Sequence, residues 1–232
     1  ECRQDIGEIN IAIEEISGTP VDFSHGDVDA FVPISGTIES FIKGVKAGGK
    51  QAYTEYRGKN FIREYLAGKI SAFTGANINF DEEIIMTPGT QGALFLAMGA
   101  NIMPEDKVAI VEPDYFANRK LVTFFGGIII PIQMKYTNYS DRAGIDLTEL
   151  EEAFKLGVKL FVFSNPNNPT GVIYSHEEIC SIAWLAKKYG VTVIADELYS
   201  RQIFDGRKYT HLCGQNALPD NLITIIGPSK TE

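Results

Sequence analysis

Short apolar runs recur from residue 83 onward, at intervals that leave room for a helix between most of them. The runs occupy residues 83–87, 107–111, 128–133, 159–163, 191–195 and 222–226. Strands that alternate with helices are joined by right-handed crossovers and form a mostly parallel sheet. The sequence therefore predicts an α/β fold with a mostly parallel sheet sandwiched by helices.

Apolar residues three or four positions apart predict helices around and between these runs. The predicted helices cover residues 37–45 and 60–73, begin at residues 146–148, and cover residues 176–189. Gly75 is suited to end the second helix, because glycine adopts the left-handed conformation readily. We expect the helix that begins at Asp146 to be exposed and amphipathic, and to contain Leu150 and Phe154. Residues 5–17 indicate an N-terminal arm or short helix.

The composition favours a globular protein that acts on small molecules. Hydrophobic residues make up 44% of the 232 residues, and no apolar stretch approaches the roughly 20 residues that span a bilayer. We therefore expect no membrane helix. The net charge of −9 argues against nonspecific binding to nucleic acid or to an anionic membrane surface.

The cysteines and histidines are few and scattered. They are Cys2, Cys180 and Cys213, and His25, His176 and His211. Neither set has the spacing of a metal site. We expect no structural metal, and the sparse cysteines favour a reducing compartment, the cytoplasm.

Polar side chains follow three of the predicted strands. Asn168 comes shortly after the run at 159–163, Asp196 and Tyr199 end the run at 191–195, and Lys230 follows the run at 222–226. Ligands of open α/β sheets bind beyond the carboxyl ends of the strands. We therefore expect these four side chains to converge on one site.

Pyridoxal phosphate chemistry requires this set of groups. A lysine forms a Schiff base with the cofactor aldehyde, and a carboxylate keeps the pyridine nitrogen protonated so that the ring withdraws electrons. Lys230 suits the first task and Asp196 the second. Asn168 and Tyr199 are suited to bond the 3-oxygen of the ring and to tune the protonation of the imine.

Each of these residues also fits a structural role when it is taken alone. The Asn-Pro-Asn-Asn-Pro run at 165–169 is typical of a turn, and Asp196 could cap a following helix. Lys230 could be a solvated surface residue. The functional interpretation depends on their joint presence, because three independent turns have no reason to carry complementary chemistry.

Three motifs carry a resemblance to a known family. NNPTG at 167–171, DELY at 196–199 and SK at 229–230 resemble the signature blocks of the class I and II aminotransferases, which are fold type I pyridoxal-phosphate enzymes. The separations, 28 residues from Asn168 to Asp196 and 34 from Asp196 to Lys230, also resemble the family. The resemblance implies an enzyme that moves an amino group between an amino acid and a 2-oxo acid, with Lys230, Asp196 and Tyr199 as catalytic residues.

A glycine-rich turn precedes another predicted helix. In TPGTQGAL at residues 87–94, unpaired backbone N–H groups at a helix start favour an anion. By resemblance, Gly89, Thr90 and Gln91 hold the cofactor phosphate. A turn that serves packing alone is the alternative.

The resemblance implies three further roles. Tyr115 corresponds to an aromatic residue that stacks on the pyridine ring, although it could instead be a core residue. Tyr56 corresponds to a tyrosine that crosses a homodimer interface to the neighbouring subunit's cofactor phosphate. Gly26 corresponds to a glycine that lies against the substrate, which Asn168 also contacts, and an ordinary turn glycine is the alternative for Gly26.

The chain also departs from the family pattern. Family members continue well beyond the lysine, with two arginines that bind the cofactor phosphate and the substrate carboxylate. We therefore expect a fragment, inactive alone, that lacks the C-terminal small domain and one strand of the sheet. Residues 1–36 would form an N-terminal arm and part of the small domain, and residues 37–232 an incomplete cofactor-binding large domain. Gly227 stands where many relatives carry a serine that bonds the phosphate.

Other functions remain as alternatives. The same catalytic groups serve lyases, decarboxylases and cyclopropane-forming synthases of this fold, and a non-catalytic α/β binding module could retain the pocket. Residues 44–50 match the Gly-x4-Gly-Lys part of a nucleotide-binding loop. That loop requires a preceding strand and a following Ser or Thr, whereas here a helical pattern precedes and Gln51 follows. We therefore interpret residues 44–50 as a helix end.

Overall fold

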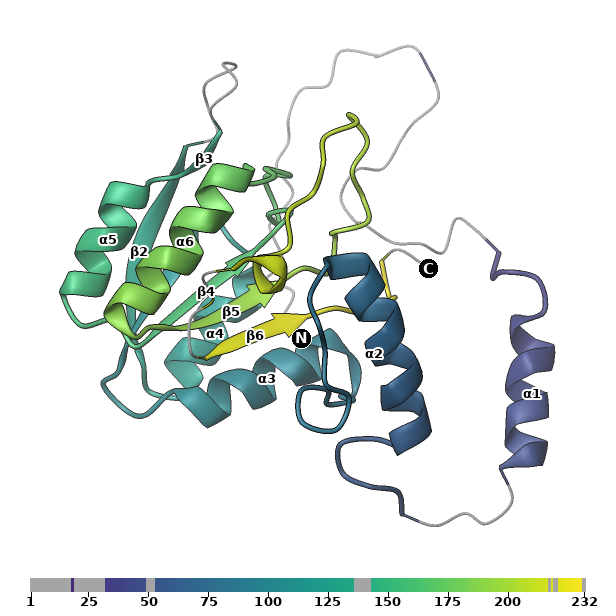
Figure 1. Ribbon diagram of the computed structural model, residues 1–232. Helices are drawn as coiled ribbons and strands as arrows, with labels where there is room; N and C mark the ends of the chain where they lie inside the picture. Colours follow the sequence, from purple (N-terminus) through teal and green to yellow (C-terminus); the bar gives the residue numbers. More distant parts are fainter. Residues whose placement is uncertain are drawn as a thin grey trace. The chain divides into compact units, whose positions relative to one another are not determined.

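The structure is a computed structural model that describes residue 18 and residues 32–48, 53–135, 143–216, 218 and 221–230 (Figure 1). It divides the chain into two compact units, residues 1–51 and 52–232. The first unit contains helix α1 (Thr37–Ala47), whose end is marked by a hydrogen bond from Gly48 N–H to Gly44 O at 2.9 Å. The glycine-rich stretch that begins at Gly44 is thus a helix end, as predicted. The predicted arm at residues 5–17 lies outside the described residues, and the domain boundary after residue 36 stays a prediction.

The second unit contains a six-stranded sheet. Its strands are β1 (Lys107–Glu112), β2 (Ile128–Lys135), β3 (Gly144–Ile145), β4 (Leu160–Ser164), β5 (Thr192–Asp196) and β6 (Leu222–Ile225). Their order across the sheet is β3-β2-β1-β4-β5-β6. All neighbouring pairs are parallel except β2 and β3, which are antiparallel. The predicted α/β class and mostly parallel sheet are confirmed.

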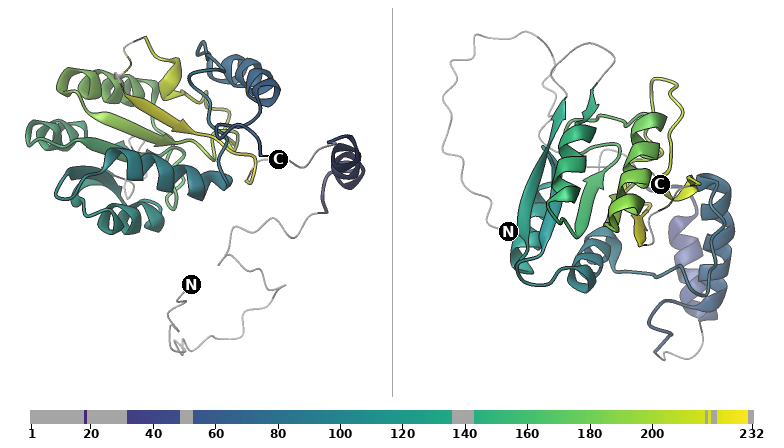
Figure 2. Two further views of the ribbon diagram at one scale, coloured as in Figure 1. Left: turned by 90° about the horizontal axis from the view of Figure 1, so that it is seen from below. Right: turned by 60° about the vertical axis from the view of Figure 1, so that its left-hand side comes forward.

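Helices cover both faces of this sheet, as the views in Figures 1 and 2 show. Helices α3 (Gly89–Asn101) and α4 (Phe116–Phe124) pack on one face, and α5 (Leu147–Lys155) and α6 (His176–Tyr189) on the other. Successive residues of β4 alternate between the two cores, with Phe161 and Phe163 facing α5 and α6 and Val162 facing α3 and α4. Because both faces are buried, the strands appear in the sequence as unbroken apolar runs.

The predicted strand at 83–87 is absent, which corrects the sequence analysis. Residues 84–87 have an extended course without strand pairing, and Met86 N–H donates to Arg57 O at 3.0 Å. Ile84 is 7% exposed, whereas Ile85 and Met86 are 61% and 43% exposed, so only one apolar side chain of this run is buried. Burial does not alternate along the run, and no described strand lies beside it.

Helix α5 is an amphipathic surface helix, as predicted, and its apolar residues form its buried side. Leu150 is 0% and Phe154 is 3% exposed, because both pack into the core beneath α5 and α6. Asp146 caps this helix by accepting the N–H groups of Thr148 and Glu149 at 3.0 and 3.2 Å. The apolar side therefore supports the sheet, and only the polar side faces solvent.

The other predicted helix ends are confirmed. Helix α2 (Asn60–Thr74) ends at Gly75, which adopts φ 78° in the left-handed region. Helix α6 begins with a capping box in which Ser175 and Glu178 exchange hydrogen bonds, and it ends at the left-handed Gly190. Among the described residues, every helix is too short or too polar to cross a membrane.

A buried Glu197–His211 pair joins the end of α2 to the sheet. Glu197 follows β5, and His211 precedes the short 3₁₀ helix η1 (Leu212–Gly214). Glu197 Oε2 lies 2.5 Å from His211 Nδ1, and Glu197 Oε1 accepts the Leu212 N–H at 3.2 Å. The His211 ring meets Phe73 of α2 edge-on, with 4.5 Å between ring centroids. The pair therefore fixes the segment after β5 against α2.

We expect the Glu197→Ala variant to lower the free energy of unfolding by about 3 kcal/mol, because it leaves the buried polar groups of His211 and Leu212 without a partner. His211→Ala should have a comparable cost, and the double variant should cost clearly less than the sum. Denaturant unfolding of the full-length protein measures all three changes, with Glu177→Ala, an exposed acid at the start of α6, as control. Additive costs would contradict the pairing.

Candidate functional site

The parallel register brings the ends of the strands to one edge of the sheet. Asp196, the last residue of β5, lies opposite Ser164 of β4 on one side and Ile225 of β6 on the other. The loops that leave this edge carry four of the predicted site residues: Tyr115, Asn168, Tyr199 and Lys230. The topology therefore places these four residues at the position where α/β sheets bind ligands.

Asp196 is a carboxyl that is buried without a cationic partner among the described residues. It is 7% exposed, and Leu198 N–H donates to its Oδ1 at 3.2 Å. Burial raises the pKa of Asp196 to about 6, which the neighbouring charge of Glu197 also favours, whereas the Leu198 hydrogen bond opposes the shift. A group that costs this much to ionise at neutral pH is suited to a cationic ligand.

Asn168 and Tyr199 meet at a pocket of about 400 Å³. The pocket is also lined by Pro166, Asn167, Pro169, Gly171, Ile173, Gln202, Phe204 and Asp205. Burial raises the pKa of the Tyr199 hydroxyl, and the charge of Asp196 and the phenol of Tyr115 add to this shift. Tyr199 thus lies close enough to Asp196 and Tyr115 to interact with both electrostatically.

The start of α3 provides backbone N–H groups beyond Gly89, whose own N–H donates to Thr87 O at 2.8 Å. The helix begins at Gly89, which has φ 74°, and no side chain caps it. Tyr115 donates its hydroxyl to Gln91 Oε1 at 3.4 Å, so the aromatic residue before α4 reaches the first turn of α3. The predicted residues Gly89, Thr90, Gln91 and Tyr115 therefore occupy one region, in which an anion would be stabilised.

Gly227 is held close to this turn. A Cβ atom at Gly227 would lie 2.7 Å from Thr90 Cγ2 and 3.5 Å from Leu198 Cδ1. The space that a serine side chain would need is thus already taken by the Thr90 methyl group. This contact gives a steric reason for a glycine at residue 227.

Lys230 lies in the turn after β6 and is half-buried. Its carbonyl accepts a hydrogen bond from Gln202 Nε2 at 2.5 Å, and Gln202 lines the pocket that contains Asn168 and Tyr199. The backbone of Lys230 is therefore attached to the pocket wall. The convergence of its Nζ on Asp196 stays a prediction.

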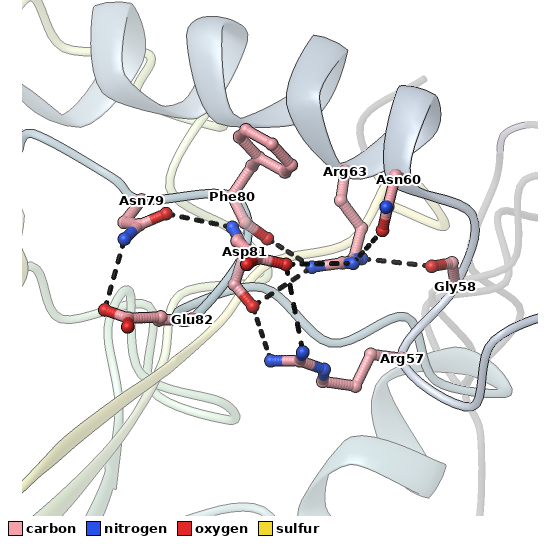
Figure 3. Close-up of polar contacts among 8 residues, drawn as sticks. All are labelled: Arg57, Gly58, Asn60, Arg63, Asn79, Phe80, Asp81 and Glu82. Carbon is pink, nitrogen blue, oxygen red and sulfur yellow. Dashed lines mark hydrogen bonds and ion pairs between the residues drawn. The ribbon is translucent and has the colours of Figure 1, made fainter.

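Tyr56 lies apart from this pocket and lines a second one of about 510 Å³. The Tyr56 side chain is fully exposed. Buried Arg63 holds the neighbouring backbone at Gly58 in place (Figure 3). Arg63 donates to Gly58 O at 3.0 Å and to the carbonyls of Phe80 and Asp81. The guanidinium thereby joins two loops and fixes the backbone beside an exposed tyrosine.

Sequence reasoning missed Asp114 and Ser164, which connect two loops of the site. Ser164 donates its hydroxyl to Asp114 Oδ1 and accepts the Asn168 N–H at 3.1 Å. The available signal was Ser164, a polar residue at the last position of an apolar strand.

Gly26 lies outside the described residues. Within the part of the chain that the structure describes, no group of three or more His, Cys, Asp or Glu side chains could hold a metal.

Known proteins are similar to this chain over most of its length. The family model for aminotransferase class I and II matches residues 20–231. Aspartate aminotransferase of Sulfolobus acidocaldarius is 31% identical over 81% of this chain and 46% of its own length. Kynurenine–oxoglutarate transaminase of Dictyostelium discoideum is 30% identical over 87% of this chain and 49% of its own length.

A solved structure agrees with these sequence matches. The crystal structure of an aspartate aminotransferase from Rhodobacter sphaeroides 2.4.1 superposes with a TM-score of 0.88 at 59% identity, and covers 94% of this chain and 56% of that chain. The chain spans about half the length of the curated relatives that it matches. On the sequence match, the shared fold and the strand-end motifs together, the chain belongs to the class I and II aminotransferases, a family of pyridoxal-phosphate-dependent enzymes.

Proposed function

We propose that the protein that contains this chain is a pyridoxal-phosphate-dependent aminotransferase, which moves an amino group between an amino acid and a 2-oxo acid. The observation that carries the proposal is Asp196, a buried carboxyl without a cation among the described residues, at the end of β5. The names of the similar proteins, which include aspartate and kynurenine–oxoglutarate aminotransferases, support the reaction class.

The residues at the sheet edge fit the cofactor. Asp196 would pair with the protonated pyridine nitrogen, because that cation offsets the cost of ionising a buried carboxyl. Bound pyridoxal phosphate acts as an electron sink for the bonds at the α-carbon of the amino acid. The turn at the start of α3, at Gly89, Thr90 and Gln91, would hold the phosphate, with the N–H groups of Thr90 and Gln91 as donors, because the Gly89 N–H already donates to Thr87 O at 2.8 Å.

Other side chains orient the ring. Tyr115 offers an aromatic face for stacking, while its hydroxyl is tied to Gln91 at 3.4 Å. Asn168 and Tyr199 share the pocket and would donate hydrogen bonds to the 3-oxygen of the ring. Since the Thr90 methyl group fills the space beside Gly227, residue 227 contributes no side chain to the phosphate site.

Lys230 has two tasks in this proposal. Its Nζ would hold the cofactor, and the same amine would take the proton from the α-carbon of the amino acid and return it elsewhere, as a general base and acid. The attachment of the Lys230 carbonyl to Gln202 supports this role, because it holds the turn that carries the amine.

The quaternary arrangement and location belong to the same proposal. We propose a homodimer in which exposed Tyr56 reaches the neighbouring subunit's cofactor phosphate and Gly26 lies against the substrate. The Arg63 contacts support the role of Tyr56, because they hold the backbone at Gly58, two residues after Tyr56, while Tyr56 does not line the pocket that contains Asn168. Cys180 and Cys213 are free thiols, which supports a cytoplasmic location.

Residues 1–36 would form the arm and part of the small domain, and residues 37–232 part of the large domain.

The full-length protein should transfer the amino group of an amino acid to a 2-oxo acid. Incubation with ¹⁵N-labelled amino donors and unlabelled 2-oxo acids, followed by mass spectrometry, measures the transfer. The label should appear in the new amino acid in equal amount to the 2-oxo acid formed. Release of ammonia or carbon dioxide without transfer would indicate a lyase or decarboxylase instead, and bound cofactor without any turnover would indicate a binding module.

The Lys230→Ala variant should lose the visible absorbance band of the holoenzyme and at least about 10³-fold of its activity, because the amine that binds the cofactor and moves the proton is gone. Absorbance spectra and borohydride reduction followed by peptide mass spectrometry locate the attachment. Lys159→Ala, an exposed lysine at the opposite edge of the sheet, is the control. A cofactor band that survives in Lys230→Ala would contradict the assignment.

The Asp196→Asn variant should stabilise the cofactor-free protein at pH 7 and weaken cofactor binding. The folded pKa of Asp196, about 6, lies above the usual value of 3.8, so its ionisation costs about 3 kcal/mol in the folded state. This cost is absent below about pH 4, grows between about pH 4 and 6, and stays constant above about pH 6. Unfolding curves of apo protein at pH 4, 6 and 8, with cofactor titration, measure both effects. A variant less stable at pH 8, with unchanged affinity, would refute the role.

A further inference from the structure

Asp114 is a carboxyl at the sheet edge that the mechanism above does not use. It follows β1 and precedes α4, and three donors surround its carboxyl. Tyr115 N–H donates to Oδ1 at 2.7 Å, the Ser164 hydroxyl also donates to Oδ1, and Asn118 Nδ2 donates to Oδ2 at 3.3 Å. The carboxyl is therefore the acceptor on which the β1–α4 loop and the end of β4 meet.

Ser164 extends these contacts to the turn that carries Asn168. Its side chain is 2% exposed, and its only proton is donated to Asp114. Both lone pairs of Ser164 Oγ are then free to accept the Asn168 N–H at 3.1 Å and the Asn167 Nδ2 at 3.4 Å. Without an acceptor at residue 114, the Ser164 hydroxyl would rotate. Its proton would then point toward Asn168 N–H or Asn167 Nδ2, and Ser164 Oγ would no longer accept a hydrogen bond from that group.

We propose that Asp114 is a positioning residue of the site, which fixes the Asn167–Asn168 turn through Ser164 and fixes Tyr115 through its backbone N–H. The inference rests on the proposed function, because Asn168 and Tyr115 are the residues assigned to the 3-oxygen and the face of the cofactor ring. One carboxyl thereby sets the distance between the residue that stacks on the ring and the residue that bonds its edge.

The surroundings of Asp114 show which substitution would preserve its contacts. Asn118 Oδ1 is buried and has no hydrogen-bond partner in the described structure. The Asn118 amide could turn over, since its oxygen and nitrogen are close in shape, and then accept a proton from residue 114. An asparagine at 114 would keep the oxygen that accepts Tyr115 and Ser164 and would offer its own N–H₂ to Asn118.

The charges around Asp114 favour such an uncharged state. Burial raises its pKa to about 7, and the negative charge of Asp196 on β5 contributes to the shift, while the three hydrogen bonds oppose it. The buried phenol of Tyr174, after β4, also faces Asp114, and the pKa of that phenol is raised by burial and by the Asp114 charge. Nearby Glu112 is already paired with Arg119. An amide at 114 is therefore compatible with this environment.

Hydrogen exchange of the cofactor-free full-length protein tests the positioning directly. In Asp114→Ala the amide of Asn168 should exchange at least about tenfold faster, which corresponds to one lost hydrogen bond, whereas Asp114→Asn should stay within about threefold of wild type. Ser164→Ala should reproduce the loss, and the double variant should add nothing to it. Asp106→Ala, which removes an acceptor of a backbone N–H at the other end of β1, is the control.

Cofactor binding provides the second readout. The dissociation constant for pyridoxal phosphate should rise about tenfold in Asp114→Ala, and the circular dichroism of the bound cofactor should weaken, because the ring loses its fixed stacking partner. In Asp114→Asn, the dissociation constant and the circular dichroism of the bound cofactor should both stay close to the wild-type values. Unchanged exchange at Asn168, or unchanged cofactor dichroism in a folded Asp114→Ala variant, would overturn the inference. A wild-type protein that binds no cofactor would instead overturn the proposed function, while the exchange data still decide whether Asp114 fixes the turn.

Discussion

The parallel register of β4, β5 and β6 is the constraint on which the site depends. Because Asp196 lies opposite both Ser164 and Ile225, the loops after three different strands start at the same level. The register is strongly specified, because a slip by one residue would exchange the side chains that face the two cores. Groups separated by tens of residues in the sequence are thus placed side by side by backbone hydrogen bonds alone.

The stability of this sheet permits two carboxyls that would be unfavourable elsewhere. Burial raises the pKa of Asp196 to about 6 and that of Asp114 to about 7, so both oppose folding when they ionise at neutral pH. The strands of the sheet contribute fully buried residues to two separate hydrophobic cores, one on each face. The burial of these residues supplies the compensating stability. Functional sites commonly hold such destabilising groups, and a cationic ligand ring would relieve the cost at Asp196.

The parts that the sequence predicted correctly are those that local pattern determines. Five of the six predicted strands exist, and Gly75 ends α2 in the left-handed conformation, because burial on two faces and the freedom of glycine both leave direct traces in the residue order. The run at 83–87 failed, since apolar residues without a neighbouring strand form no ladder. Periodicity also predicted the amphipathic helix that contains Leu150 and Phe154, but it does not show what covers the apolar side, so the packing partners of these residues came only from the structure. The contacts of Asp114 and of the Glu197–His211 pair join loops that are distant in the sequence, so the residue order does not show which residues meet, although Ser164 at the end of β4 marks one partner.

Gly227 shows why a motif should be interpreted together with its surroundings. From the family pattern alone, Gly227 would be interpreted as the loss of a serine hydroxyl. In the structure, the methyl group of Thr90 occupies the space where a side chain at 227 would lie, with 2.7 Å left for a Cβ atom. A change at either position alone would produce a clash or a cavity, so the two residues form one steric unit. In the proposed phosphate site, the start of α3 would therefore contribute backbone N–H groups and Thr90, without a side chain from residue 227.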